Sequence, residues 1–320
     1  MTTGNNDSFA FVMNINHMVD APSYTLVPGY ELRPATVSEI RIIKMIIAEL
    51  PADNFLVNDG LFWECRWPHF GGTIERVSQD QWRYFVIAFN GTEKSAETVE
   101  DIQSAFDLSP IELERGFTGS YGLPTQPPGT YGAASRPVMF FHILREAQSQ
   151  RNSFFKDISR NDLEITKKIY LEIQQNNNTP SDVRKILSQL RELKGLPHES
   201  PLRFLGYFAI LESLLTHDPK PGDPYDSITR QVQKKVALLD HRFERHIDYT
   251  PFGDTSSEKI WSRMYGYRSC LAHGGTPDFG RDLKVLIDHE HALNLLKETV
   301  KSTVVQALAE PQLLFDLREC

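Results

Sequence analysis

The sequence predicts an α+β domain at the N-terminus followed by an all-α domain, an antiparallel helical bundle. Two observations support this prediction. Residues 28–135 combine a strong strand pattern with helical patterns and end in a segment rich in Gly and Pro. After about residue 150, amphipathic helical patterns follow one another with short connections, which favours an antiparallel bundle. We therefore expect domains at 28–135 and 136–320, preceded by a partly ordered lead-in over residues 1–27.

Local patterns place the first elements of the N-terminal domain. Residues 30–34 read as a short strand. Thr36 and Glu39 form the signature of a capping box, in which a hydroxyl and a carboxylate satisfy the free N–H groups at the start of a helix. The apolar run behind them is expected to be a helix over residues 40–50, which Pro51 ends.

The second half of this domain has one strong strand and a break in periodicity. Residues 82–89 are β-branched and aromatic, which makes them the strongest strand candidate of the chain. Residues 97–106 are expected to be helical. The Gly- and Pro-rich residues 119–137 are expected to be a loop or linker, and an aromatic run at 138–141 follows them.

The C-terminal domain is expected to consist of helices with recognisable starts. Ser159 with Asp162, Thr179 with Pro180, and Thr255 with Glu258 have the residue types that begin helices. The expected helices run over residues 160–175, 180–194, 201–216, 227–243, 256–273 and 289–309.

The composition narrows the classes of function. With 40% hydrophobic and 24% charged residues, the chain has the balance of an ordinary globular protein. The formal net charge of −8 argues against a protein that coats nucleic acid, which needs a broad basic surface, but it allows an enzyme with a small cationic site.

The cysteines and the lack of long apolar runs indicate the cellular compartment that the sequence favours. Cys65, Cys270 and Cys320 lie far apart and are odd in number, so neither a disulfide framework nor a cysteine metal site is expected. A reducing cytoplasm is the simplest setting for such a chain. The polar N-terminus lacks the pattern of a signal peptide, and no apolar run approaches the roughly 18 residues of a membrane span.

The helix that ends near residue 273 carries the candidate site. Four apolar residues are spaced to form one buried face of it: Ile260, Met264, Tyr267 and Leu271. Arg268 lies just off that face, His273 lies in the last turn, and Gly274 is expected at the left-handed position after the helix. The electronegative end of a helix favours a protonated imidazole.

An arginine beside a histidine has the chemistry that RNA cleavage needs. Arg268 keeps its proton and can hold a phosphate with two donors, while His273 can take or give a proton near neutral pH. RNA carries its own nucleophile, the 2'-hydroxyl. Because five positions on an ideal helix place two side chains about 140° apart, the pair converges only through a distorted last turn, a long sweep of the Arg side chain, or a partner copy in a dimer.

Glu212 is the second informative residue. Its helical neighbours are apolar, and a carboxylate in an apolar stripe is costly unless it is paired. Arg268 is the candidate partner, and such a pair would orient the guanidinium.

Two segments resemble a known family. Residues 203–215, Arg-Phe-Leu-Gly-Tyr-Phe-Ala-Ile-Leu-Glu-Ser-Leu-Leu, and residues 267–274, Tyr-Arg-Ser-Cys-Leu-Ala-His-Gly, look like a HEPN domain of the Apea-like type. The resemblance covers roughly residues 157–310. It implies a helical bundle that is usually a homodimer, with an Arg-x4–6-His motif at a helix end that cleaves RNA without a metal or cofactor. Many members act as toxins or antiviral-defence effectors.

The resemblance also assigns residues. Arg268 and His273 take the motif positions, and Glu212 matches the acidic position on the first bundle helix. The residue after the arginine is Ser269, where active members commonly have Asn, Asp or His; a serine can still donate to a phosphate. A basic strip of Lys234, Lys235, Arg242 and Arg245 would guide an RNA backbone, although a solvated helix face explains it equally well.

Other patterns have plainer explanations. The Arg-x-His spacing also occurs at Arg136–His142 and Arg191–His198, which we attribute to chance. His241 and His246 are not expected to bind a metal, because positions five apart do not share a helix face. His289 and His291 are expected at the surface.

The aromatic residues Trp63, Trp67, Tyr84 and Phe85 could stack on bases but favour a core role, and Asp223, Asp226 and Asp254 are expected in turns or caps.

The sequence thus supports three hypotheses. The first is a homodimeric ribonuclease whose N-terminal domain senses, regulates or recruits, through a regulatory ligand or protein. The second is a catalytically silent HEPN module that binds RNA or a partner protein, with Arg268 and Glu212 as a structural ion pair and His273 as a helix-capping residue. The third is a structural helical protein without a role in nucleic-acid chemistry.

Overall fold

The computed structural model divides into two compact units, Met1–Gln174 and Gln175–Cys320. Each unit has its own arrangement of elements and is described by itself. The structure describes residues 8–49, 61–66, 74–91, 94–121, 131–134, 154–176, 182–219 and 227–319.

The first unit is built on an antiparallel sheet. Its six strands follow the order β3-β4-β7-β1-β8-β9. They are β1 (Ser8–Val12), β3 (Tyr24–Val27), β4 (Tyr30–Pro34), β7 (Phe85–Phe89), β8 (Arg115–Tyr121) and β9 (Tyr131–Ala134). Two pairs of short strands add β10 (Lys156–Ile158) parallel to β2 (Ile15–Met18), and β5 (Cys65–Arg66) antiparallel to β6 (Glu75–Arg76).

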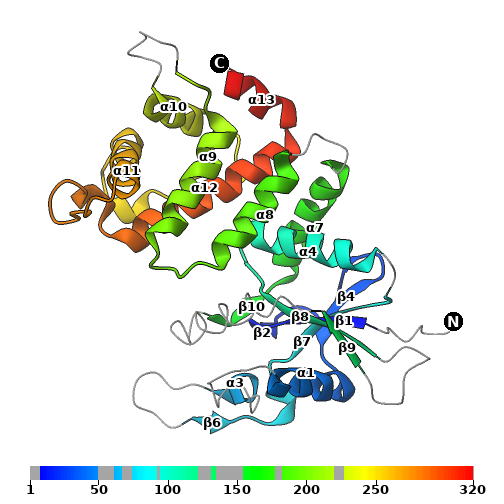
Figure 1. The fold of residues 1–320 in the computed structure, drawn as a ribbon. Coiled ribbons are helices and arrows are strands. Elements are labelled where there is room, and N and C mark those ends of the chain that lie inside the picture. Colours follow the sequence, from blue (N-terminus) through cyan, green and yellow to red (C-terminus); the bar gives the residue numbers. More distant parts are fainter. Residues whose placement is uncertain are drawn as a thin grey trace. The chain divides into compact units, whose positions relative to one another are not determined.

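Helices cover both faces of this sheet (Figure 1). Alternate residues of a strand point to opposite faces. Phe9 and Phe11 of β1 therefore pack with the apolar residues of α1 (Val37–Glu49) and α3 (Leu61–Glu64). Ala10 and Val12 pack on the other face, in the cluster that includes α4 (Ser95–Leu108) and α7 (Arg160–Gln175). Because both faces are buried, β1 is hydrophobic from Phe9 to Val12 and has no alternating pattern.

The predicted capping box at Thr36 and Glu39 is confirmed, and the predicted helix start at Ser159 and Asp162 forms a second one. The Thr36 hydroxyl accepts from the Glu39 N–H at 3.3 Å, and a Glu39 carboxylate oxygen accepts from the Thr36 N–H at 2.7 Å. Ser159 and Asp162 make the same reciprocal pair before α7, with distances of 3.2 and 2.9 Å. The expected strand at 30–34 and the helix at 97–106 are also present, the latter within α4.

Three expectations for this half of the chain are wrong. Of the lead-in 1–27, the part that the structure describes forms β1, β2 and β3. The division into 28–135 and 136–320 also fails, because the first unit extends to Gln174: β10 pairs with β2, and Leu163 of α7 joins the core of the sheet. Within the expected linker 119–137, β9 pairs with β8.

Glycine explains why the linker prediction failed. Gly119 of β8 lies opposite Phe9 of β1, and a Cβ built on Gly119 would lie 2.6 Å from the Phe9 ring. The glycine makes room for a buried aromatic ring, so its presence marks close packing and not a turn. Residues 135–153, which include the aromatic run 138–141, lie outside the described residues.

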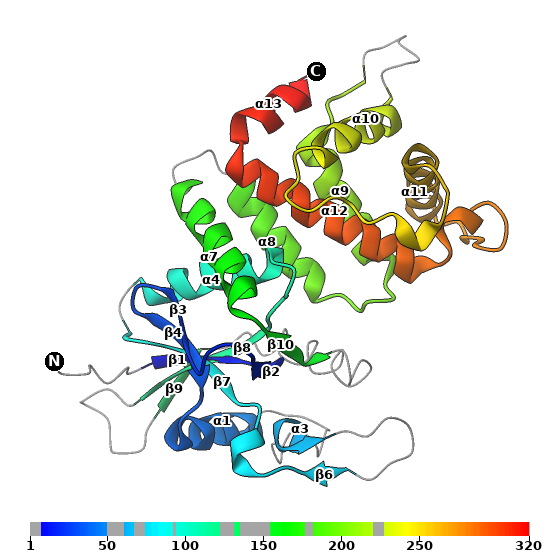
Figure 2. The ribbon, with the colours of Figure 1, turned by 180° about the vertical axis from the view of Figure 1, so that it is seen from behind.

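The second unit consists of helices gathered around α9 (Figure 2). They are α8 (Asp182–Lys194), α9 (Pro201–Leu215), α10 (Ile228–Asp240), α11 (Ser257–Ala272), α12 (His289–Ala309) and α13 (Pro311–Glu319), with 3-10 turns at Thr250–Phe252 and Lys284–Leu286. Helix α9 contacts α8, α10, α11, α12 and α13. The predicted helices agree closely with these bounds, but α13 was not predicted, because the last expected helix ends at residue 309. The expected start at residues 179–181, and Asp223 and Asp226, lie outside the described residues.

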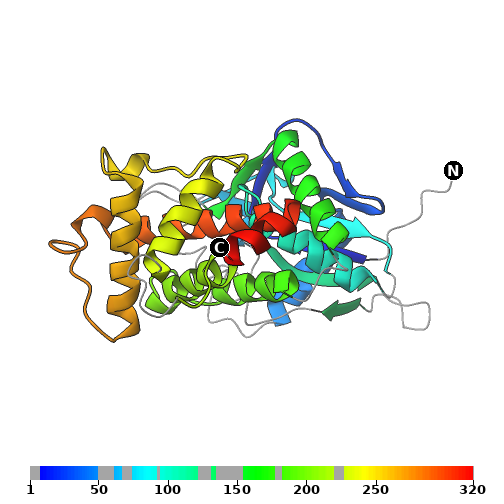
Figure 3. The same ribbon diagram turned by 90° about the horizontal axis from the view of Figure 1, so that it is seen from above.

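The helical unit departs from a simple antiparallel bundle at α11. Seen from above, α11 runs across the direction of α12 and not alongside it (Figure 3). Helix α11 packs against both α9 and α10. Its last turn is followed by a long connection to α12 that contains the Lys284–Leu286 turn. Among the helices described here, none has both the length and the apolar character for a membrane crossing.

Candidate functional site

The candidate site is built on the C-terminal half of α11. The predicted buried face is confirmed for Ile260, Met264 and Tyr267, whereas Leu271 is only half-buried. Trp261 is buried as well, and its indole N–H donates to the Tyr249 hydroxyl at 2.9 Å. The packed face fixes the rotation of α11, so that Arg268 lies at the edge between core and solvent.

The end of α11 has the predicted glycine cap. Gly274 adopts a φ of +70° and donates its N–H to the carbonyl of Leu271 at 3.1 Å. Gly275 donates to the carbonyl of Cys270 at 2.8 Å. These two bonds form a Schellman motif, which satisfies the last carbonyls of the helix. The chain therefore leaves the helix sharply, just after His273.

Arg268 and Glu212 form the predicted ion pair between α11 and α9. The Nη2 atom of Arg268 lies 3.1 Å from Oε2 of Glu212. The guanidinium side chain keeps 31% of its surface exposed, and the carboxylate side chain keeps 15%. Within the described residues, the other carboxylate oxygen, Oε1, is buried without a hydrogen-bond partner. One nitrogen of the guanidinium is thus held, while other nitrogens remain open to a ligand.

Aromatic rings support the same guanidinium. Its central carbon lies 5.8 Å from the ring centroid of Tyr265. The Tyr265 ring meets Phe208 of α9 edge-on, with 6.2 Å between the centroids. A cation over an aromatic face is attracted by the ring quadrupole. The arginine is therefore positioned by a carboxylate and by a ring that is itself packed.

His273 lies at the C-cap of α11 and is exposed. Its backbone N–H donates to the Ser269 carbonyl at 3.1 Å, as in a regular helical turn. The distorted last turn that would bring the two side chains together is therefore absent from α11. Among the described residues, the imidazole of His273 has no hydrogen-bond partner, which leaves both ring nitrogens available.

A partly buried network next to the site was missed by sequence reasoning. The Tyr267 hydroxyl lies 2.7 Å from Nδ1 of His289, and Nε2 of His289 lies 3.2 Å from the carbonyl of His198. A carbonyl can only accept, so Nε2 carries the hydrogen and Nδ1 accepts from the tyrosine. The expectation of a surface position for His289 is wrong, because it is half-buried. Its partners are 22 and 91 residues away along the chain, so no local spacing could reveal them.

Burial raises the pKa of Tyr267 to about 12, and the nearby Cys270 acts in the same direction. The phenol therefore stays protonated across the neutral range and can keep donating to His289. This contact ties α11 to the first turn of α12, close to the candidate residues.

The predicted basic strip is not a continuous surface. Lys235 is buried, with 6% of its surface exposed, because it lies on the inner face of α10 between Val232 and Val236. Arg242 is exposed but forms an ion pair with Glu310 at 3.0 Å. Lys234 is exposed, and Ser269 is half-buried. The expected exposure of Lys235 is wrong, whereas Lys234 and Arg245 are exposed and form no ion pair with any described residue.

The remaining candidates have structural places. Trp63, Tyr84 and Phe85 are core residues, as favoured, while Trp67 lies outside the described residues, as do Arg136 and His142. His291 is half-buried and contacts Asp288, and Asp254 is exposed. His246 bonds to the Asp240 carbonyl at 2.8 Å. In the described part of the chain, no three His, Cys, Asp or Glu side chains gather as a metal site would require.

No family model, curated protein or solved structure matches this chain. The arguments about function that follow therefore depend on the residues and on the geometry described above.

Proposed function

We propose that the chain is a metal-independent endoribonuclease of the HEPN type, which cleaves RNA through its 2'-hydroxyl. We further propose that it acts as a toxin or as an effector of antiviral defence, a role that its resemblance to that family supports. The proposal assigns RNA as substrate, a homodimer as the active form, and no cofactor. Arg268 and His273 are the proposed catalytic residues, and Glu212 is the proposed positioning residue.

One observation carries the proposal. A single nitrogen of the Arg268 guanidinium is anchored by Glu212, while 31% of the side chain remains exposed at the end of the same helix that bears His273. A carboxylate that only neutralised a buried arginine would cover it. Here the carboxylate holds one edge and leaves donors for a phosphate, which guanidinium groups bind with two parallel hydrogen bonds.

The chemistry follows from these two groups. As His273 takes the proton, the 2'-oxygen of a ribose attacks the adjacent phosphorus. The bond from phosphorus to the 5'-oxygen breaks, and that oxygen receives a proton. The products are a 2',3'-cyclic phosphate and a 5'-hydroxyl. Arg268 stabilises the charge on the phosphorane. A general acid or base contributes about 10²–10⁴-fold, and stabilisation of developing charge is often the larger effect.

The regular last turn of α11 supports a dimer in this proposal. Because the five positions between Arg268 and His273 turn the helix by about 140°, one copy offers the two groups on different sides. Two copies that meet through this helix end would supply an arginine and a histidine to one phosphate from opposite sides, and the second histidine would fill the other proton-transfer role.

A second candidate function is a catalytically silent HEPN module that binds RNA or a partner protein. Ser269 favours it, because this position commonly holds Asn, Asp or His in active members of the family. The ion pair between Arg268 and Glu212 would then serve to join α9 and α11.

The test is RNA cleavage by purified protein in the presence of EDTA. We expect Arg268→Ala and His273→Ala to lose cleavage by at least about 100-fold while the fold is retained. The helix offers matched controls. Arg263 is an exposed arginine of the same helix, and His241 is an exposed C-cap histidine of α10. Arg263→Ala and His241→Ala should cleave like the unchanged protein.

The alternatives give different results. A silent module would bind RNA or its partner with or without the two substitutions and would cleave under no condition. Loss of activity in Arg263→Ala equal to that in Arg268→Ala would show a general electrostatic effect and would contradict the assigned roles.

A further inference from the structure

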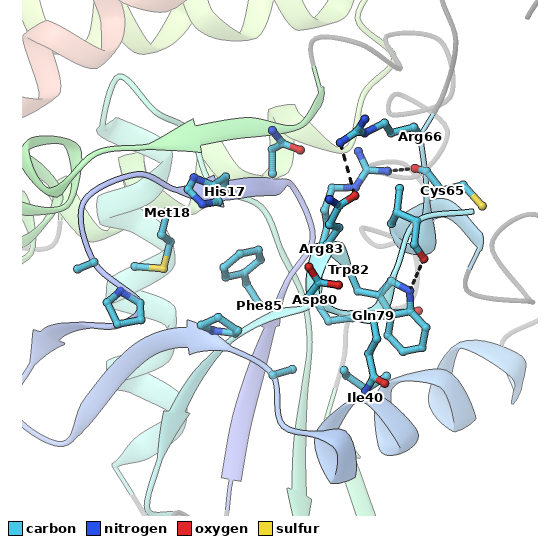
Figure 4. Close-up of a pocket in the computed structure, with 18 residues that line it drawn as sticks. His17, Met18, Ile40, Cys65, Arg66, Gln79, Asp80, Trp82, Arg83 and Phe85 are labelled. Atoms are coloured by element: carbon cyan, nitrogen blue, oxygen red, sulfur yellow. Dashed lines mark hydrogen bonds between the residues drawn. The ribbon is translucent and has the colours of Figure 1, made fainter. Parts of the chain in front are cut away.

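The first unit contains a cavity of about 660 Å³ that plays no part in the proposed RNA cleavage (Figure 4). Four segments form its walls: the end of β2 and the turn after it, the stretch from the end of β4 into α1, the β5 strand, and residues 77–85, which lead into β7. This volume lies within the roughly 300–1,000 Å³ of small-molecule sites.

Two arginines line the cavity, and neither forms an ion pair within the described part of the chain. Arg83 donates from Nη2 to the carbonyls of Phe62, at 3.0 Å, and of Cys65. Its guanidinium lies over the Phe155 ring, 3.7 Å from the centroid. Arg66 lies opposite Glu75 in the β5–β6 pair, and among the described residues its side chain donates to the side-chain oxygen of Gln81 at 3.5 Å. Carbonyl oxygens hold a guanidinium in place without cancelling its charge, so the wall remains positive.

The local carboxylates leave this charge uncompensated. Glu64, the neighbour of Cys65, is occupied by Lys44 at 2.7 Å and by the Tyr84 hydroxyl at 3.2 Å. Asp80 lines the cavity but is exposed and pairs with neither arginine. Burial lowers the pKa of Arg83 to about 10, and the charge of Arg66 acts in the same direction. Arg83 is still protonated at neutral pH.

Apolar and aromatic side chains form another part of the lining. Trp82 is half-buried and is held by a hydrogen bond from its indole N–H to the Val77 carbonyl at 3.3 Å. Phe85 and Met18 are buried side chains that also reach the cavity. Figure 4 shows Arg66 and Arg83 on one side of the cavity and His17 with Met18 on the opposite side. A ligand in the cavity therefore meets two cations on one side, with the aromatic and apolar side chains of Trp82, Phe85 and Met18 also within its walls.

We propose that this cavity binds a small organic phosphate with a planar ring, of the size of a nucleoside monophosphate. The phosphate contacts Arg66 and Arg83, since guanidinium groups match phosphate geometry with paired donors. The ring lies against the apolar lining. The site is independent of the proposed ribonuclease, because all of its residues belong to the first unit.

The test is calorimetric titration of the full chain with AMP, adenosine and inorganic phosphate. We expect AMP to bind saturably. Adenosine should bind more weakly by roughly tenfold or more, because it lacks the charge-assisted hydrogen bonds of the phosphate. Inorganic phosphate should compete with AMP but bind less tightly. Equal affinity for AMP and adenosine, or no saturable binding of AMP at millimolar concentration, would overturn the proposal. Phosphate that binds as tightly as AMP would overturn the role of the ring.

Two variants with opposite expected effects on the affinity for AMP, and one control, sharpen the test. Arg66→Ala should lower the affinity by roughly tenfold. The control Arg76→Ala should leave the affinity unchanged, because Arg76 is exposed on the adjacent strand β6 and does not line the cavity. Asp80→Asn should raise the affinity for AMP, because it removes a negative charge from the cavity. Weaker AMP binding by Asp80→Asn would contradict the proposal that uncompensated positive charge drives binding in this cavity.

Discussion

The two units hold their key arginines in opposite ways. In the second unit, Arg268 is paired with the Glu212 carboxylate at 3.1 Å. In the first unit, Arg83 is held by backbone carbonyls and by an aromatic ring. A carboxylate orients a guanidinium, but seen from a distance its negative charge cancels the positive one. Such a pair therefore attracts a bound anion weakly, and it stabilises mainly the negative charge that develops beside the guanidinium during a reaction. Carbonyls orient without cancelling, which suits a stable complex with an anion. One arrangement is suited to a reaction and the other to binding.

The largest expected effect comes from removing the carboxylate. Glu212→Ala should lower RNA cleavage by about 100-fold, because misplacement of a catalytic group by about 1 Å has a cost of that order. The loss should appear in kcat more than in KM. Glu212→Asp should recover part of the rate, since it keeps the charge near Arg268.

The matched control is Glu258→Ala, an exposed carboxylate in the first turn of the same helix α11. It should cleave normally. An unchanged cleavage rate in Glu212→Ala would mean that the carboxylate does not position Arg268, and the contrast between the two units would lose its basis.

The next largest effect is expected from a change in core packing in the first unit. Gly119→Ala should lower the free energy of unfolding by about 1–3 kcal/mol, the usual cost of overpacking a core, because the new Cβ would lie 2.6 Å from the buried Phe9 ring. Urea unfolding followed by circular dichroism measures this. Gly266→Ala is the control: it is exposed on α11, nothing lies within 4 Å of the new Cβ, and it should stabilise the helix by roughly 0.5–1 kcal/mol.

The glycine cap of α11 gives a smaller effect for a different reason. Around Gly274 there is space for a side chain, but its φ of +70° is unfavourable for any residue with a Cβ. Gly274→Ala should therefore destabilise the second unit by about 1 kcal/mol. Thermal unfolding measures the change, and Gly274→Asn should recover part of it, because Asn tolerates this conformation. An unchanged melting temperature in Gly274→Ala would contradict the cap.

The smallest expected effect is a loss of folding stability at alkaline pH. The folded pKa of Tyr267, about 12, is raised from an ordinary value of 10.0. The folded state therefore holds this proton more tightly than the unfolded state does. The resulting stabilisation is complete below pH 10 and is lost as the pH rises to about 12. In urea unfolding at pH 8 and at pH 11, Tyr267→Phe should lose less stability between the two values than the unchanged protein. Equal losses would contradict the shift.

Local signals in the sequence were sufficient for much of the fold. Each capping box joins two residues within one helical turn: Thr36 with Glu39, and Ser159 with Asp162. The pairing of Glu212 with Arg268, 56 residues apart, followed from the cost of an unpaired carboxylate in an apolar stripe. That argument works because few cations lie on the facing helix.

What the sequence did not reveal depends on distant partners. The strand β1 has no alternating pattern because both its faces are covered, and β8 contains glycine because Phe9 needs the space. His289 resembles a surface residue until Tyr267 and His198 are placed beside it. Lys235 has the residue type of a solvent-exposed position, yet the rotation of α10 buries it. Periodicity and residue type do not encode these contacts.

The central claim is that Arg268 and His273 cleave RNA through its 2'-hydroxyl. It is tested most directly by incubating the purified protein with a pool of transcripts in EDTA and by determining the chemistry of the product ends. The account predicts 2',3'-cyclic phosphate and 5'-hydroxyl ends, which are absent with Arg268→Ala and with a 2'-O-methylated substrate. Intact transcripts, or ends that form equally with the Arg268→Ala protein, would contradict it.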